Sequence, residues 1–367
     1  MKYRSDTDPD FQMLEHMLLN GRFGPLKFLE KNDPFHDIDL LNSLSPLAEQ
    51  ISGQLGIEPA DIGLTSLELP TRYDNPLAFH ILTALTDSLK DTCRALDWDT
   101  SEFPEHACIP TGSVNAHAVK LEKSGKQLIV FDSQIFFFCN LFSKAIASAL
   151  PVEYAEERYQ FSCDPEVVFQ HLSTDATGVR QLGALLKAGF EEGPSSAPAW
   201  IPAKPYVAMA GMLRESMELF LVAHEYGHIL HDHLGTSRML NAVSGFADDR
   251  KHIKEYEADA IGWLLSFTAM RRKGYDIGTS YIGAALLFLG FELREKYAYF
   301  RDSGSMAGYV PTSKSTHPSN DARVAMMNRV AALFIKPPNL DRALELQKNY
   351  RAIVDFMFEI VVRRHVG

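Results

Sequence analysis

The residues with the clearest chemical potential are His224, Glu225 and His228, which form an H-E-x-x-H motif in the segment LFLVAHEYGHILHDHLG. Residues four positions apart on an α-helix lie on the same face, so both imidazoles would project in one direction. Two neutral imidazoles at that spacing can bind one Zn²⁺ ion, which accepts nitrogen and oxygen ligands in a tetrahedral shell. Glu225 would lie beside them, where its carboxylate can take a proton from a water molecule on the metal. The motif therefore predicts a zinc site with a general base.

The residues around the motif argue against a simpler interpretation, in which these polar side chains only cover the exposed face of a helix. The preceding turn, residues 219–223, is apolar on all sides, which is typical of a buried helix. Burying two histidines and a glutamate costs several kcal/mol unless they are paired or bound to a metal. We therefore expect the motif to bind metal.

A third ligand is expected from a helix at residues 249–274. Its apolar residues recur at helical spacing, and it ends in two arginines and a lysine followed by Gly274, which is typical of a helix C-terminus. Glu255 and Asp259 are four residues apart on one face, so one carboxylate can bind the metal while the other accepts the free ring N–H of a ligand histidine. We predict Glu255 as the ligand and Asp259 as the partner of the histidine. Glu257 is the alternative ligand, but helix geometry turns it away from the face of Asp259.

The H-E-x-x-H motif followed by the E-x-x-x-D of EYEAD resembles the gluzincin metallopeptidases, in particular the HtpX-like and CAAX-prenyl-endopeptidase-like group. The segment STHPSNDAR, residues 315–323, is similar to a T-H-P-x-x-x-x-R element of that group. The resemblance implies that His317 lies at the active-site cleft and that Arg323 is a structural or site-organising partner. It also implies that Asn115, in an N-A pair before a strand, contacts the substrate. The alternative for Asn115, as for His117, is an ordinary strand residue.

Two further histidines, His231 and His233, follow the motif, and His233 matches a histidine often found at the end of the group's first zinc helix. We expect both to complement the helix C-terminus, with contact to metal or substrate as the alternative. The chain departs from the group's pattern in two places. The stretch from about 150 to 205 is longer than the usual connection, and the usual glycine-rich turn of the hairpin is reduced to Ser124-Gly125. The subfamily and the substrate therefore stay open.

The order of the expected elements indicates an α+β, predominantly helical fold. The resemblance implies a zincin-like (minigluzincin) catalytic core with a small β-hairpin flanking the H-E-x-x-H helix. We expect a helical N-terminal region at residues 1–105, either a structural half of the core or a substrate-selecting cap. A metallopeptidase domain at 106–367 would follow, with a long insertion at about 150–205. Apolar spacing predicts helices at 9–20, 38–55, 77–97, 279–298 and about 340–364, and hairpin strands at 114–122 and 127–132.

Composition narrows the class of protein. The chain of 367 residues is 46% hydrophobic and 23% charged, which is ordinary for a globular protein. Its net charge of -11 argues against a nucleic-acid partner. The charged N-terminus shows no secretory signal and no apolar run reaches the roughly 20 residues that span a bilayer, so we expect a cytoplasmic protein without membrane insertion. The four cysteines show no C-x-x-C spacing and are expected to be free thiols.

These observations predict a zinc-dependent metalloendopeptidase with one Zn²⁺ per chain, acting on a protein or peptide. Glu225 would serve first as general base and then as general acid. His317 and Tyr309 are candidates for stabilising charge on the substrate oxygen, and His317 could instead bind the zinc in a resting state. Two alternatives stay open. One is a regulatory or defence peptidase of the ImmA/IrrE or phage-exclusion Lit type that cleaves one specific host protein, and the other is a non-catalytic, metal-stabilised binding module. The oligomeric state is not predicted.

Overall fold

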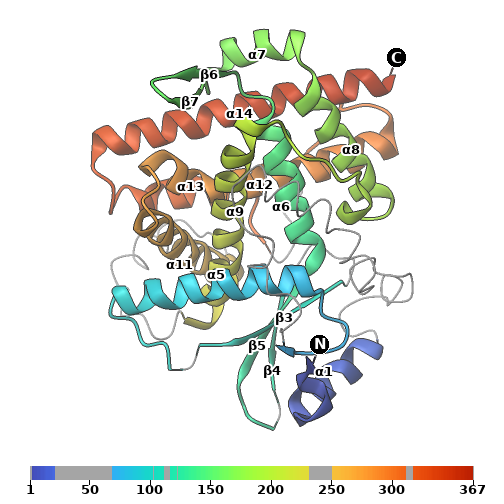
Figure 1. The fold of residues 1–367 in the computed structure, drawn as a ribbon, viewed down its shortest axis with the longest axis vertical. Coiled ribbons are helices and arrows are strands. Elements are labelled where there is room, and N and C mark those ends of the chain that lie inside the picture. Colours follow the sequence, from blue (N-terminus) through green and yellow to red (C-terminus); the bar gives the residue numbers. More distant parts are fainter. Residues whose placement is uncertain are drawn as a thin grey trace. The chain divides into compact units, whose positions relative to one another are not determined.

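Helices make up most of the part of the chain that the structure describes (Figure 1). The structure is a computed structural model and describes residues 2–20, 68–101, 103–110, 116–121, 123–230, 250–310 and 317–366. The longer helices within these ranges are α1 (Pro9–Leu19), α5 (Pro76–Ala95), α6 (Ser133–Ala147), α7 (Pro165–Thr174), α8 (Thr177–Glu191), α9 (Lys204–Leu230), α11 (Arg250–Arg272), α12 (Ile277–Ser303), α13 (Asn320–Ala331) and α14 (Pro337–Val366). The prediction of an α+β, predominantly helical chain is confirmed.

The strands are short and form small separate sheets. They are β1 (Lys2–Tyr3), β2 (Glu68–Leu69), β3 (Glu105–Ile109), β4 (Ala116–Lys120), β5 (Gln127–Asp132), β6 (Val152–Ala155) and β7 (Arg158–Phe161), with short 3₁₀ turns η1 (Arg4–Asp6) and η4 (Pro194–Ser196). The predicted hairpin is confirmed, because β4 pairs antiparallel with β5 and Lys120 lies opposite Gln127. Strand β3 pairs with β5 in parallel, which gives the order β3-β5-β4.

The chain separates into two compact units, Met1–Lys90 with Asp99–Phe136, and Asp91–Trp98 with Phe137–Gly367. In the first unit, α1 packs its apolar face on the three-stranded sheet, with Phe11, Leu14 and Leu18 buried against sheet residues such as Ile109 and Val130. The run Leu-Ile-Val-Phe in β5 is buried along its whole length, as expected of a strand that is covered on both faces. The predicted division near residue 105 stays a prediction.

The second unit is built from helices and contains the H-E-x-x-H motif. In it α9 packs against α11 and α12, while α14 packs against α7, α8 and α12. Helix α14 runs at a steep angle to α9 (Figure 1). The core of this unit includes the fully buried ring of Trp263, which stacks on Phe267 and meets Tyr281 edge-on. This core fixes α11 and α12 relative to each other and so supports the faces that carry the motif residues.

The predicted helices that fall on described residues are present. Helix α1 covers 9–19, α5 covers 76–95, α12 covers 277–303 and α14 covers 337–366, whereas the helix expected at 38–55 lies outside the described residues. The stretch at about 150–205, which is longer than the usual connection, contains β6, β7, α7 and α8.

Two other expectations concern cysteines and membranes. All four cysteines are free thiols, and the predicted core residue Cys139 is fully buried. Among the helices in the described ranges, none is both long enough and apolar enough to cross a bilayer.

Candidate metal centre

A close crossing of α9 and α11 brings the predicted ligands together. A Cβ atom on Gly227 would lie 2.8 Å from the backbone oxygen of Ala258, and one on Gly262 would lie 2.9 Å from the backbone N and Cα of His224. No real Cβ makes such contacts, so both positions require glycine as long as the helices stay this close. Each helix carries its small residues four apart, Ala223 with Gly227 and Ala258 with Gly262. This four-residue spacing of small residues is a sequence signal for a tight helix crossing, which the H-E-x-x-H motif alone does not reveal.

The side chains of His224, His228 and Glu255 form one cluster at this crossing, with a ligand atom from each within 4.8 Å of the others. Nε2 of His224 lies 3.7 Å from Oε2 of Glu255, and Nε2 of His228 lies 3.5 Å from Oε1. These distances are too long for good hydrogen bonds. They are close to the separation of about 3.4 Å expected between two ligands of a tetrahedral Zn²⁺ with bonds of roughly 2.0–2.2 Å. Glu257 does not belong to this cluster.

Asp259 holds the imidazole of His224 in the orientation that a metal ligand needs. Nδ1 of His224 donates to Oδ1 of Asp259 over 2.9 Å, and the carboxylate is fully buried. With Nδ1 engaged, Nε2 is the ring nitrogen that remains for a metal, and it points to the Glu255 carboxylate. The predicted partnership of Asp259 with a ligand histidine is therefore present as a contact.

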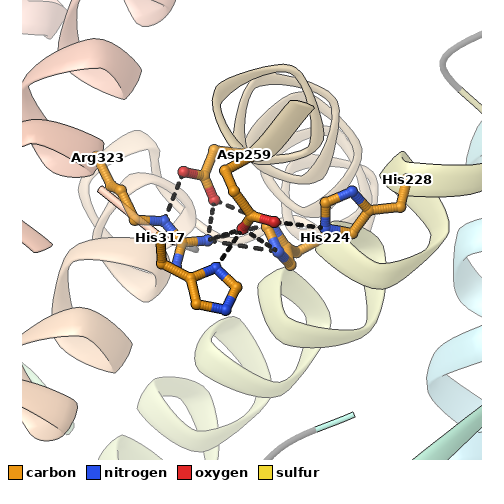
Figure 2. Close-up of polar contacts among 6 residues, drawn as sticks. His224, His228, Asp259, His317 and Arg323 are labelled. Carbon is orange, nitrogen blue, oxygen red and sulfur yellow. Dashed lines mark hydrogen bonds and ion pairs between the residues drawn. The ribbon is translucent and has the colours of Figure 1, made fainter. Parts of the chain in front are cut away.

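Arg323 fixes Asp259 from the other side. Its Nε and one terminal nitrogen donate to the two oxygens of Asp259 over 2.7 and 2.6 Å, in a bidentate pair (Figure 2). The guanidinium also lies 4.2 Å from the ring centre of Phe288. Although burial alone would raise the pKa of Asp259, the charge of Arg323 and the hydrogen bond from His224 hold it at about 2. Asp259 is therefore ionised at neutral pH.

The start of α13 positions both residues of the T-H-P-x-x-x-x-R element. Ser319 is the N-cap of α13, and its side chain accepts from the backbone N–H of Ala322, so Arg323 lies near the start of the helix with its side chain toward α11. His317 lies two residues before this cap, with its side chain 46% exposed. Nδ1 of His317 is 2.9 Å from Oε2 of Glu255 (Figure 2). The structure thus brings His317 to the edge of the cluster.

Burial and neighbouring charges set the protonation of the other site residues. Burial, together with the nearby His224, lowers the pKa of His228 to about 4, so this imidazole is neutral at pH 7 and able to bind metal. Burial raises the pKa of Glu225. The nearby His224 opposes this rise, and the nearby Glu255 adds to it. For Glu255 burial would raise the pKa, but the neighbouring imidazoles of His317, His224 and His228 hold it below its ordinary value. His228 is therefore available as a neutral nitrogen ligand and Glu255 as a carboxylate ligand.

Some predicted residues are not part of this cluster. Asn115, His231 and His233 lie outside the described residues. Tyr309 packs its ring against Tyr299, and the charged groups that act on it are those around Glu292 rather than the metal ligands. The structure shows no contact between Tyr309 and the described metal ligands, and its role toward a substrate stays a prediction.

Comparisons of the chain with protein-family models, with curated proteins and with solved structures give no match. The functional argument therefore rests on the geometry of His224, His228, Glu255 and the residues that hold them.

Proposed function

We propose that this protein is a zinc-dependent metalloendopeptidase that hydrolyses peptide bonds of a protein or peptide substrate. The observation that carries the proposal is the cluster of His224, His228 and Glu255, with Glu225 next to the first ligand. Two imidazoles and one carboxylate are the ligand set of catalytic zinc sites that keep a fourth position for water. A structural zinc site would instead be closed by four protein ligands.

The residues fit a bound cation. The carboxylate of Glu255 turns one oxygen toward Nε2 of His224 and the other toward Nε2 of His228, and Nδ1 of His317 lies 2.9 Å from its Oε2. A buried carboxylate facing two imidazole nitrogens is the donor set that a divalent cation such as Zn²⁺ binds, so a metal ion between these atoms would stabilise the charge of Glu255. When bound, Zn²⁺ would supply Lewis acidity toward the scissile carbonyl and toward a water molecule.

The chain's own residues supply the proton transfers and the positioning. Glu225 takes a proton from the attacking water and delivers it to the leaving amine, and its raised pKa brings it closer to neutrality, where a residue can act in both directions. His317, at the exposed edge of the cluster, donates a hydrogen bond to the substrate oxygen as negative charge develops there. Asp259 and Arg323 keep His224 fixed and touch no substrate atom in this scheme.

The metal assignment is tested by measuring zinc per chain after reconstitution of metal-free protein. We expect about one zinc per chain for the wild type and loss of binding for Glu255→Gln. Glu257→Gln is the matched control, because it removes a carboxylate from the same helix outside the cluster, and it should bind zinc as the wild type does. Wild-type protein that takes up no zinc would refute the assignment.

The catalytic assignment is tested with Glu225→Gln. This variant should keep its zinc and lose about 10²- to 10⁴-fold in peptide hydrolysis, which is the usual contribution of a general base. Mapping new protein N-termini after expression of the wild type beside this variant also identifies the substrate. Cleavages that persist unchanged in the variant would contradict the mechanism.

His317→Ala separates the two roles considered for this residue. If His317 stabilises the substrate oxygen, the variant should keep zinc and lose about 10²- to 10³-fold in kcat. An increase in activity would instead identify His317 as an inhibitory ligand.

A further inference from the structure

A second candidate site lies in the helical unit, in a pocket between α12, α13 and α14. Its volume is about 310 Å³, the lower end of the range for small-molecule sites. Each helix contributes one face to it, and its walls are largely aliphatic, with Ile282, Leu286 and Leu289 from α12, Val324 from α13 and Leu344 from α14. None of the metal ligands lines it. The pocket is therefore distinct from the metal centre, and its aliphatic walls suit a branched apolar group.

Two polar groups from α14 give the pocket a chemical preference. Oε1 of Gln347 is buried and has no hydrogen-bond partner among the described residues, so it is an acceptor in need of a donor. Lys348 is exposed at the rim and forms no ion pair with any residue in the described ranges. The neighbouring Arg351 is already engaged by Glu292 and Asp321. Asp321 and Arg351 of the lining pair with each other, so Lys348 is the lining cation that has no ion pair within the described ranges.

We propose that this pocket binds an N-acylated apolar amino acid with a free carboxylate, the chemistry shared by small acyl amino acids and by the C-terminal residue of a peptide. The apolar side chain would lie against the aliphatic walls. The amide N–H would donate to Oε1 of Gln347, and the carboxylate would pair with the ammonium of Lys348. Each group of the ligand thus meets a group of the pocket that lacks a partner within the described part of the chain.

The pocket and the metal centre share helix α13. Val324 faces the pocket, whereas the preceding residue, Arg323, is bonded to Asp259. Asn328, one turn beyond Val324 on the pocket side, accepts a hydrogen bond from the hydroxyl of Tyr281 on α12. A ligand in the pocket would contact the same helix that holds Arg323 in place. Because of this shared helix, binding has to be measured with and without zinc.

The proposal is tested by calorimetric titration of the full-length, metal-free protein with N-acetyl-leucine. We expect saturable binding with a dissociation constant on the order of 1 mM, given the small size of the probe. Lys348→Gln should weaken binding at least 5-fold, and N-acetyl-leucinamide, which lacks the carboxylate, should bind the wild type equally weakly. Lys187→Gln, which removes an exposed lysine on α8 that does not line the pocket, is the matched control and should bind as the wild type does. Both are surface substitutions, and unchanged melting temperatures would show that both variants fold.

Three results would overturn the proposal. The first is no saturable binding at concentrations several-fold above the expected dissociation constant. The second is equal binding by Lys348→Gln and Lys187→Gln. The third is binding only to zinc-loaded protein, which would place the carboxylate on the metal instead. An acetylated tripeptide ending in leucine distinguishes the two possible ligands, and either result supports the proposal. Affinity equal to that of N-acetyl-leucine identifies peptide C-termini as the ligand. Weaker affinity identifies free acyl amino acids.

Discussion

Adding one methyl group at Gly262 tests whether the close crossing of α9 and α11 builds the metal centre. In the Gly262→Ala variant, the new Cβ would lie 2.9 Å from the backbone N and Cα of His224. Carbon atoms in proteins pack at about 3.5–4.0 Å, so the two helices would have to separate by roughly 0.5–1 Å at this point. Backbone atoms cannot rotate away as a flexible side chain can, so the whole crossing has to adjust.

The magnitude follows from two opposing effects. Overpacking of this kind costs about 1–3 kcal/mol. Replacing glycine by alanine within a helix returns about 0.5–1 kcal/mol, so we expect a net loss of about 1–2 kcal/mol in the free energy of unfolding. The effect on zinc affinity should be larger than this loss of stability alone suggests, because His224 and His228 lie on one helix and Glu255 lies on the other. A shift of roughly 0.5–1 Å exceeds the tolerance of about 0.2 Å in metal–ligand distances, so zinc affinity should fall by about 10- to 100-fold.

Urea unfolding of metal-free protein and competition for zinc with a chromophoric chelator measure the two effects separately. The matched control is Gly211→Ala on α9, where an added Cβ would meet no atom within 4 Å. This control should gain up to about 1 kcal/mol in stability and bind zinc as the wild type does. If Gly262→Ala were as stable as Gly211→Ala and bound zinc equally well, the close crossing would not be what positions the ligands.

Three other predictions concern groups around the site and in the core. Arg323→Met and Asp259→Asn should each cost about 3–5 kcal/mol in unfolding free energy, because each leaves a buried partner unpaired, and the double variant should lose far less than the sum. Glu218 is buried, and burial raises its pKa from 4.5 to about 7 in spite of Arg214. The stabilisation that Glu218 contributes is present below pH 4.5 and is lost as the pH rises through about 7. Glutamine at this position cannot ionise, so the free energy of unfolding of Glu218→Gln relative to the wild type should increase by about 2 kcal/mol between pH 5 and pH 8, as measured by chemical unfolding. Gly304 ends α12 with a φ of 72°, so Gly304→Ala should lower the free energy of unfolding by about 1 kcal/mol, whereas an unchanged value would mean that alanine adopts this conformation without strain.

Much of the second unit could be predicted from the sequence because its signals are local. The H-E-x-x-H spacing, the apolar period and the Arg-Arg-Lys-Gly ending each lie within one helix, and α11, α12 and α14 begin and end within a few residues of expectation. Strand β3 was missed for the opposite reason. It is five residues long and pairs in parallel with β5 rather than with β4, the next strand in sequence, so nothing near it in the chain indicates its partner. Strands β6 and β7 are mostly exposed and lack the apolar alternation that would have indicated them.

The sequence pointed to Arg323 and Asp259 as separate residues, but their joint role depends on a contact across 64 positions that no local pattern contains. That contact makes the charge balance of the site a property of three helices. Glu255 and Asp259 have lowered pKa values and Arg323 is cationic, so without a metal these three groups already carry an excess of negative charge. Ionising Glu225 would add to this excess, and the pKa of Glu225 is raised, the direction that avoids it. A divalent cation together with Arg323 would carry three positive charges, equal to the three carboxylates when all are ionised. We therefore expect zinc binding to lower the pKa of Glu225 and so to favour the ionised general base in metal-loaded protein.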